Sequence, residues 1–321
     1  MDFIDLCSGI GGFRLSFEKN GNHCLLNCEI DKFAQETYQT NFSNHLFEKD
    51  ITKIDEKNIP NFDILCGGFP CQAFSKAGKQ KGFEDIRGTI FFDICRLLNH
   101  KRPKIFLLEN VKNLKAHDKG NTFKIISENL DKLNYHHTTF LINAKYFVPQ
   151  NRERVYILGL DKNNYSENDF NVIISIINNK YKDQKLKPLP QFKSILETQD
   201  IEKFTLSDKL WAFLQEHAKK HSLKGNGFGY GLMNESDITS RTLTARYYKD
   251  GSEVLVAQKN KNPRKLTPRE CARLMGFPDS FIIPVSNTQA YKQFGNSVVV
   301  PVIDMFSTSI NEFLEYLKNK D

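Results

Sequence analysis

Residues 2–13 read DFIDLCSGIGGF, a short apolar strand that runs directly into a glycine-rich turn. Glycines after the first strand of an α/β sheet let the backbone approach a nucleotide-like ligand closely. The spacing is Gly9-x-Gly11-Gly12, and Arg14 stands where the third glycine of the dinucleotide fingerprint G-x-G-x-x-G belongs. The turn therefore indicates a nucleotide-like ligand and counts against a nicotinamide-dependent dehydrogenase, but it leaves the ligand itself undecided.

The first 160 residues alternate short apolar runs with amphipathic stretches, which is the pattern of strand–helix repeats. This spacing predicts an open, largely parallel α/β sheet, which binds its ligands beyond the carboxyl ends of its strands. The predicted strands are 2–7, 25–30, 62–66, 104–109, 138–143 and 154–160, and the predicted helices include 13–20, 32–41, 89–98 and 122–133.

The pattern changes after Leu160. Residues 163–187 are rich in Asn, Lys and Asp and have weak periodicity, which predicts a surface excursion or linker. Residues 225–231 carry glycine at every second position, which is typical of bends and close backbone approach rather than a helix. Helical spacing returns over 301–318. We therefore expect a large domain formed by 1–182 and completed by 290–321, with a smaller, irregular, mainly β domain over 183–289.

The composition excludes several classes of protein. With 40% hydrophobic and 12% aromatic residues the chain can build a core. No stretch reaches the roughly 20 apolar residues that cross a bilayer, and the N-terminus lacks the pattern of a secretion signal, so we expect a cytoplasmic protein. The seven cysteines are odd in number and irregularly spaced, which favours reduced thiols. The pairs Cys24/Cys28 and Cys66/Cys71 lack the spacing and histidine partners of zinc sites, so no metal is expected.

The net charge of +7 is unevenly placed along the chain. Residues 183–289 contain 17 Lys or Arg against 12 Asp or Glu, so most of the excess lies there. A basic segment suggests a polyanion such as nucleic acid as partner, although an ordinary solvated surface explains this charge equally well.

Three strand ends carry candidate chemistry. The segment GGFPC, residues 67–71, places Cys71 on a loop after a buried strand, where a thiol can be ionised and exposed; a small buried core residue is the alternative. Glu109 directly follows an apolar run on the neighbouring strand, where partial burial raises a carboxyl pKa and suits a proton donor; a helix N-terminal charge is the alternative. Arg152 and Arg154 lie two apart on an extended segment and point the same way, which suits phosphates, a carboxylate or a base carbonyl.

Two further acidic residues and one loop fit the same edge of the sheet. Glu29 ends the second strand, where a carboxylate can bind ribose hydroxyls, and Asp50 could accept from an adenine amino group. Residues 76–87 form a polar, glycine-bearing connection that is long for this fold, typical of a mobile lid or of a plain surface loop.

Taken in order, five motifs resemble those of the C5-cytosine DNA methyltransferases of bacterial restriction-modification systems. They are DLCSGIGGFR (5–14), CGGFPCQAFS (66–75), LLENV (107–111), QNRERVYILG (150–159) and QFGNSVVVPV (293–302). The resemblance covers nearly the whole chain and is strongest over 1–160 and 264–300. It implies a Rossmann-like S-adenosylmethionine-dependent methyltransferase sheet with a second, target-recognition domain.

The resemblance also implies catalytic roles. Cys71 would attack C6 of a cytosine flipped out of the duplex, and Glu109 would hold its N3 and amino edge. Arg152 and Arg154 would steady the site and the O2 atom of the base. S-adenosyl-L-methionine would supply the methyl group and leave as S-adenosyl-L-homocysteine. By the same resemblance the cofactor residues are Cys7, Gly9, Ile10, Gly12, Glu29, Ile30, Asp50, Ile51, Pro70, Ile90, Asn296 and Val298. Cys7 and Ile30 depart from the aromatic residues frequent at those two positions.

The resemblance further implies double-stranded DNA as partner, with Ser75 and Arg87 of the lid among the DNA contacts. Residues 241–253 resemble the recognition stretch of enzymes that methylate within CCGG-like or CCWGG-like sites. There Arg246 is a candidate guanine reader, Thr242 a phosphate contact and Tyr247 a further DNA contact. We expect a monomer, protecting host DNA from a cognate endonuclease.

Two rival functions remain open on sequence alone. An RNA C5-cytosine methyltransferase of the tRNA-modifying kind shares the same motifs, although the basic segment after Asp183 favours duplex DNA. A catalytically silent DNA-binding subunit predicts a broken nucleophile motif, whereas Cys71, Glu109 and both arginines are present.

Overall fold

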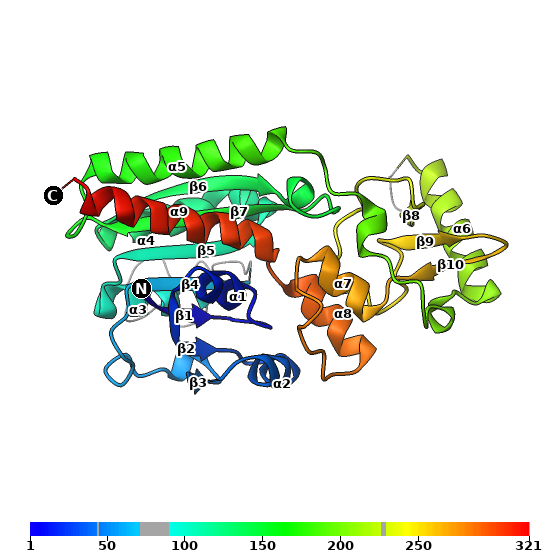
Figure 1. Cartoon of the computed structure of the whole chain (residues 1–321), viewed down its shortest axis with the longest axis horizontal. Coiled ribbons are helices and arrows are strands. Elements are labelled where there is room, and N and C mark those ends of the chain that lie inside the picture. Colours follow the sequence, from blue (N-terminus) through cyan, green and yellow to red (C-terminus); the bar gives the residue numbers. More distant parts are fainter. Residues whose placement is uncertain (44, 71–89, 226–228, 321) are drawn as a thin grey trace.

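The structure is a computed structural model that describes residues 1–43, 45–70, 90–225 and 229–320. A seven-stranded sheet has the order β3-β2-β1-β4-β5-β7-β6 (Figure 1), in which only β7 runs antiparallel to its neighbours. The strands are β1 (Asp2–Leu6), β2 (His23–Cys28), β3 (Leu46–Glu48), β4 (Ile64–Gly68), β5 (Ile105–Val111), β6 (Tyr135–Asn143) and β7 (Glu153–Asp161). The expected largely parallel α/β sheet is confirmed.

Helices cover both faces of this sheet. On one face α1 (Gly12–Lys19), α5 (Glu167–Leu186) and α9 (Val300–Lys318) pack against strand residues such as Phe3 and Leu158. On the other face α3 (Ile90–Lys101) and α4 (Asn121–Lys132) pack against residues such as Leu65 and Leu108. α2 (Lys32–Asn41) follows β2. The strands are therefore buried on both sides, which is why they read as nearly continuous apolar runs.

Helix α5 corrects the expectation for residues 163–187. That stretch is not an irregular excursion: Ser166 and Asp169 form a capping box, with the Ser166 hydroxyl accepting from the Asp169 amide at 3.2 Å. The helix buries Phe170, Ile173 and Ile177 against the core. Its many Asn and Lys side chains face outward and blur the apolar period, so the cap was the more informative signal.

The remaining elements form the right-hand end of the molecule in Figure 1. A three-stranded sheet consists of β8 (Leu232–Met233), β9 (Leu255–Gln258) and β10 (Lys261–Lys265), and α6 (Asp208–Leu223) packs beside it. Helices α7 (Pro268–Leu274) and α8 (Asn287–Asn296) connect this end to the large sheet. Buried residues of both parts, such as Leu243 and Phe306, belong to one continuous core. The division at 183 and 289 stays a prediction.

Among the described residues no single helix is long and apolar enough to span a membrane; only α8 and α9 together, bent by 40°, reach that length and composition.

Candidate active site

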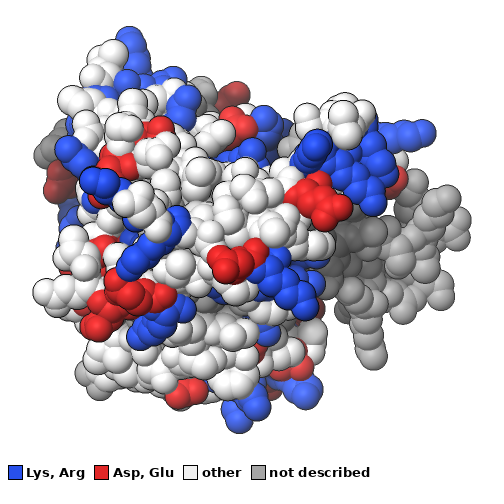
Figure 2. Space-filling view, turned by 90° about the vertical axis from the view of Figure 1, so that its right-hand side faces the viewer, with Lys and Arg blue, Asp and Glu red and all other residues white. Residues whose placement is uncertain are grey.

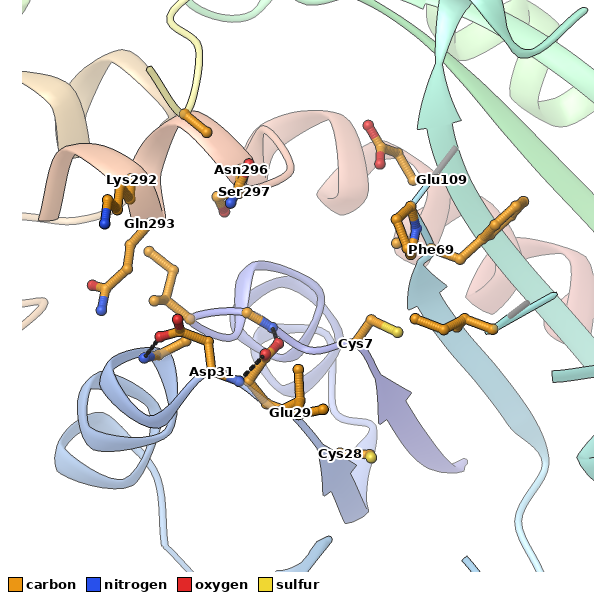
Figure 3. Close-up of a pocket in the computed structure, with 18 of the residues that line it drawn as sticks. Cys7, Cys28, Glu29, Asp31, Phe69, Glu109, Lys292, Gln293, Asn296 and Ser297 are labelled. Atoms are coloured by element: carbon orange, nitrogen blue, oxygen red, sulfur yellow. Dashed lines mark hydrogen bonds between the residues drawn. The ribbon is translucent and has the colours of Figure 1, made fainter. Parts of the chain in front are cut away.

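A cavity of about 710 Å³ opens where the carboxyl ends of β1, β2, β4 and β5 meet, with α8 on its far side. Its size is typical of a site for a small molecule or cofactor. Figure 3 shows Cys7 and Glu29 on one side of the space, Glu109 and Phe69 on another, and residues of α8 facing them. The cavity brings together ten predicted cofactor residues, namely Cys7, Gly9, Ile10, Glu29, Ile30, Asp50, Ile51, Pro70, Ile90 and Asn296, and the predicted catalytic residues Glu109, Arg152 and Arg154.

Glu29 is held in place by backbone amides at the end of β2. Its Oε2 accepts from the Gly9 amide at 2.7 Å and its Oε1 from the Asp31 amide at 2.8 Å. Burial nevertheless raises the pKa of Glu29 above its ordinary value, against the opposing effect of these hydrogen bonds. The glycine turn is thus fastened to the second strand. Gly9 has φ +54°, and a Cβ there would meet nothing within 4 Å, so the turn leaves the cavity open beside the carboxylate.

Apolar and polar groups alternate along the outer wall of the cavity. Ile30 has 72% of its side chain exposed, which is unusual for an isoleucine beside buried strands, whereas Ile51 is buried. Asp50 accepts from the amide and hydroxyl of Thr52 at 3.1 and 2.8 Å, and these hydrogen bonds lower its pKa. Asp31, which the sequence analysis did not single out, caps α2 through the amides of residues 33 and 34.

Gly12 and Val298 do not line the cavity. A Cβ on Gly12 would lie 2.6 Å from Val298 Cγ2 and 3.2 Å from Ser297 Oγ, so the two predicted cofactor residues pack against each other. The structure therefore gives them a packing role between α1 and the connection from α8 to α9, and their role at the cofactor stays a prediction.

Glu109 and Arg154 form an ion pair at the opposite end of the cavity. Arg154 pairs with Val111 across β5 and β7, which puts its side chain on the same face of the sheet as Glu109. The distance from Arg154 Nε to Glu109 Oε1 is 3.1 Å, and both side chains are largely buried. Burial raises the pKa of Glu109, and the two arginines only partly oppose it. The expected buried carboxyl on the strand beside β4 is confirmed.

Arg152 does not direct its guanidinium freely into the cavity. It is 2% exposed and donates to three carbonyls: Nη1 to Leu243 at 2.8 Å, and Nη2 to Gly295 at 3.1 Å and Ser297 at 2.8 Å. Burial and the neighbouring Arg154 lower its pKa. The two arginines of the motif therefore differ, since Arg152 fixes backbone and Arg154 faces Glu109.

Asn110 is a functional candidate that sequence reasoning missed. It is 2% exposed, and its Nδ2 donates to the carbonyl of Phe69 at 2.8 Å. That hydrogen bond ties the end of β5 to the backbone two residues before Cys71. The signal was present in the sequence, because Asn110 stands inside the motif LLENV.

Cys71, Ser75 and Arg87 lie outside the described residues, so the structure does not test their predicted roles. The adjacent Pro70 lines the cavity. No group of three or more His, Cys, Asp or Glu in the described ranges is placed to hold a metal ion.

The predicted DNA contacts have three different environments. Arg246 is exposed, as a base reader must be. Thr242 is half-buried, and its hydroxyl donates to the Asn151 carbonyl at 2.6 Å. The expectation for Tyr247 is wrong: its ring is fully buried, and its hydroxyl donates to Val254 and accepts from the Leu266 amide. Figure 2 shows this end of the molecule with Lys and Arg interspersed among acidic side chains rather than gathered into one patch.

The comparisons with known proteins identify the family of this chain. The sequence profile of the C-5 cytosine-specific DNA methylases matches residues 1–312. The type II methyltransferase M1.ScrFI of Lactococcus lactis subsp. cremoris is 53% identical over 98% of this chain and 79% of its own. M.HhaI of Haemophilus parahaemolyticus is 40% identical over 98% and 95%, respectively. The crystal structure of the S. pombe Dnmt2 methyltransferase has the same fold, with a TM-score of 0.76 at 19% identity over 99% of both chains. The chain belongs to the C-5 cytosine-specific DNA methylases and is a type II DNA (cytosine-5)-methyltransferase.

Proposed function

We propose that this enzyme transfers the methyl group of S-adenosyl-L-methionine to C5 of a flipped-out cytosine, through a covalent bond between Cys71 and C6. The observation that carries the proposal is the single cavity, in which the acidic and apolar wall around Glu29 and Ile30 faces the Glu109–Arg154 pair. One end fits a nucleoside and the other fits the polar edge of a base.

The residues of the first end fit S-adenosyl-L-methionine. Glu29 is positioned to bind the ribose hydroxyls and Asp50 the adenine amino group, while the exposed Ile30 offers an apolar surface to the adenine ring. The open space beside Gly9 would hold the amino-acid portion, and Asn296 of α8 lines the same cavity. When bound, the cofactor supplies an electrophilic methyl on a sulfonium and leaves as S-adenosyl-L-homocysteine. Cys7 and Ile30 replace the frequent aromatics, so the packing around adenine differs from the common form.

The residues of the second end fit a cytosine. The raised pKa of Glu109 keeps a proton available for N3, and Arg154 lies beside it to hold O2. The Cys71 thiolate would bond to C6 as N3 takes the proton of Glu109, so that the C5=C6 π pair becomes part of an enamine and C5 becomes nucleophilic. C5 would then take the methyl group, and N3 would return its proton to Glu109. Loss of the C5 proton to a base would form the C5=C6 bond again and expel the thiolate from C6. Arg152 also lines the cavity, and its Nη1 and Nη2 hold the backbone on two sides of the site.

The substrate is proposed to be a short specific site in duplex DNA, CCGG-like or CCWGG-like, read in part by Arg246, with Thr242, Ser75 and Arg87 at phosphates. Membership of the DNA methylase family favours DNA over tRNA, and an intact Glu109–Arg154 pair counts against a silent binding subunit. We further propose a cytoplasmic monomer that protects host DNA from a cognate endonuclease.

The test is methyl transfer from labelled cofactor to unmethylated plasmid DNA and, separately, to tRNA. Bisulfite sequencing of the plasmid then locates the modified cytosine and its flanks. A duplex with 5-fluorocytosine at that position should trap the protein covalently, because the fluorine cannot leave as a proton. Cys71→Ser should give neither methylation nor trapping. Methylation that survives Cys71→Ser, or that appears on tRNA alone, would refute the proposal.

A further inference from the structure

Gln150, Arg152 and Arg154 occupy alternate positions on one extended segment, so their side chains point to the same side. Gln150 and Arg152 both form hydrogen bonds with the backbone of the same residue, Leu243. Gln150 Oε1 accepts from the Leu243 amide at 2.9 Å, and Arg152 Nη1 donates to the Leu243 carbonyl at 2.8 Å. The third, Arg154, contacts Glu109 at 3.1 Å. One short piece of chain therefore joins Leu243, three residues before Arg246, to the carboxyl of the active site.

The orientation of the Gln150 amide is fixed from its other side. Its Nε2 donates to the carbonyl of Leu274, at the end of α7, at 3.2 Å. Gln150 and Leu243 are both fully buried. A buried side-chain amide with its oxygen and its nitrogen both used cannot rotate without leaving a backbone group unpaired. The contact between Gln150 and Leu243 thus has one geometry.

Backbone contacts run beside these side chains. The Ser240 amide donates to the Pro149 carbonyl and the Asn151 amide to the Ser240 carbonyl, both at 2.9 Å, and Thr242 binds Asn151 through its hydroxyl. The segment 240–243 is therefore fastened to the segment 149–152 along its length. After Leu243 the chain becomes more exposed and reaches Arg246.

We propose that Gln150 is a positioning residue for target selection: with Arg152, it sets the distance between the DNA-reading segment and the Glu109–Arg154 pair. The inference rests on the proposed function, in which residues 242–246 contact DNA. Gln150 does not line the cavity, so it acts through Leu243 and not on the base or the cofactor. A duplex that is read correctly then presents its cytosine in register with Glu109, whereas a mismatched duplex does not.

The inference predicts that weakening this link lowers the discrimination between sites more than it lowers cofactor binding. Gln150→Leu keeps the size of the side chain and leaves the Leu243 amide without an acceptor. Such a loss corresponds to roughly a tenfold change in an equilibrium constant. We therefore expect the ratio of kcat/KM for the cognate duplex to that for duplexes with one changed flanking pair to fall by roughly tenfold, with the affinity for S-adenosyl-L-methionine unchanged.

Gln150→Glu provides the matched comparison, because its carboxyl can still accept from the Leu243 amide. It should retain the discrimination that Gln150→Leu loses, even if both variants melt at a lower temperature. Tyr135→Phe controls for general destabilisation: it removes a buried hydroxyl that donates to the Pro103 carbonyl at 2.7 Å, at the opposite end of β6 from the site. It should lower Tm and leave the discrimination unchanged.

The inference would be overturned if Gln150→Leu discriminated between sites as well as the wild type does. It would also be overturned if Tyr135→Phe lost as much discrimination as Gln150→Leu. If Gln150→Leu does not fold, Gln150→Glu decides the matter. A folded Gln150→Glu that loses discrimination overturns the inference, and one that retains discrimination supports it. The proposed function fails separately, if the wild-type enzyme methylates all duplexes alike or methylates only tRNA.

Discussion

Gly295→Ala is a sharp test of how closely α8 approaches residues 242–246, the proposed DNA-reading segment. Gly295 is buried near the end of α8, and its carbonyl accepts from Arg152 Nη2. An added Cβ would lie 2.3 Å from the carbonyl carbon and oxygen of Thr244 and 2.4 Å from the amide nitrogen of Ala245. Ordinary contact begins at 3.4 Å, so the space is short by about 1 Å. All three atoms belong to the backbone, and no side-chain rotation can relieve the overlap.

Two opposing effects set the expected magnitude. Glycine to alanine within a helix is favourable by up to about 1 kcal/mol, because the unfolded glycine has more conformational freedom. Overpacking against a rigid neighbour costs about 1–3 kcal/mol. We therefore expect the free energy of unfolding to fall by about 1–2 kcal/mol. A displacement of about 1 Å at residues 244 and 245 should also lower kcat on the cognate duplex by about 10²-fold, because reacting groups tolerate little misplacement.

The assay combines urea unfolding with single-turnover transfer of labelled methyl groups to the cognate duplex. Thr288→Ala is the control: it lies on the exposed face of α8 and meets no clash, so the helix preference alone should make it neutral or slightly stabilising. A Gly295→Ala variant with raised stability and an unchanged single-turnover rate would show that the segment is not held against α8, and the coupling through Arg152 would have to be abandoned.

Three further predictions concern ionisable and hydrogen-bonding groups at or below the site. Burial raises the pKa of Glu109, so the proton needed at N3 is lost as pH rises through that raised value and kcat should fall on the alkaline side. Glu109→Gln should lower kcat by about 10²–10⁴-fold and should not show this alkaline decline. If Glu109→Gln still shows the decline, another group causes it. Asn110→Ala removes the donor to the Phe69 carbonyl and should lower the single-turnover rate while cofactor affinity stays intact. The opposite pattern, weak cofactor binding with a normal rate, would show that Asn110 does not act on the chain that leads to Cys71. Asp5 is fully buried, and burial raises its pKa well above the ordinary value despite the opposing effects of Arg14 and of a hydrogen bond with Tyr38. The folded protein thus binds a proton that the unfolded chain loses near pH 4, so this stability is complete below that pH and is lost as pH rises toward the folded pKa, by about 1.4 kcal/mol per pH unit. Urea unfolding at pH values rising from 4 should show Asp5→Asn gaining on the wild type at that rate until the folded pKa is reached, and parallel curves from pH 4 upward would show that Asp5 is already ionised.

Within the first 160 residues the order of strands and helices, β3 excepted, could be predicted from the chain itself, because local apolar patterns decide which segments are buried. The predicted strands over 2–7 and 104–109 differ from β1 and β5 by no more than two residues at either end. The apolar pattern of residues 163–187 does not reveal α5, because this helix has only a short buried stripe among polar side chains. The capping box at Ser166 is the sequence signal that marks its start.

Single residues in a motif were harder to predict from sequence, because burial and contacts depend on distant segments. Tyr247 directly follows the candidate reader Arg246 in the sequence, yet its ring is buried and its hydroxyl binds residues 254 and 266. Gly12 resembles the other glycines of its turn in the sequence. Only the structure shows that the missing side chain of Gly12 leaves room for Val298, almost 290 residues away in the chain.

The sequence by itself determined that residues 2–13 form a strand and a glycine-rich turn, that a carboxyl lies near the end of a strand at Glu109, and that the motifs belong to one family. These are local properties, because a strand end and its neighbours are consecutive in the chain. Only the tertiary structure decided that Arg154 pairs with Glu109 while Arg152 turns away to Leu243 and α8. The physical reason is that the two side chains are chemically identical and lie on the same side of an extended segment, so the local sequence cannot distinguish them. The segments that fold against each arginine determine its partner.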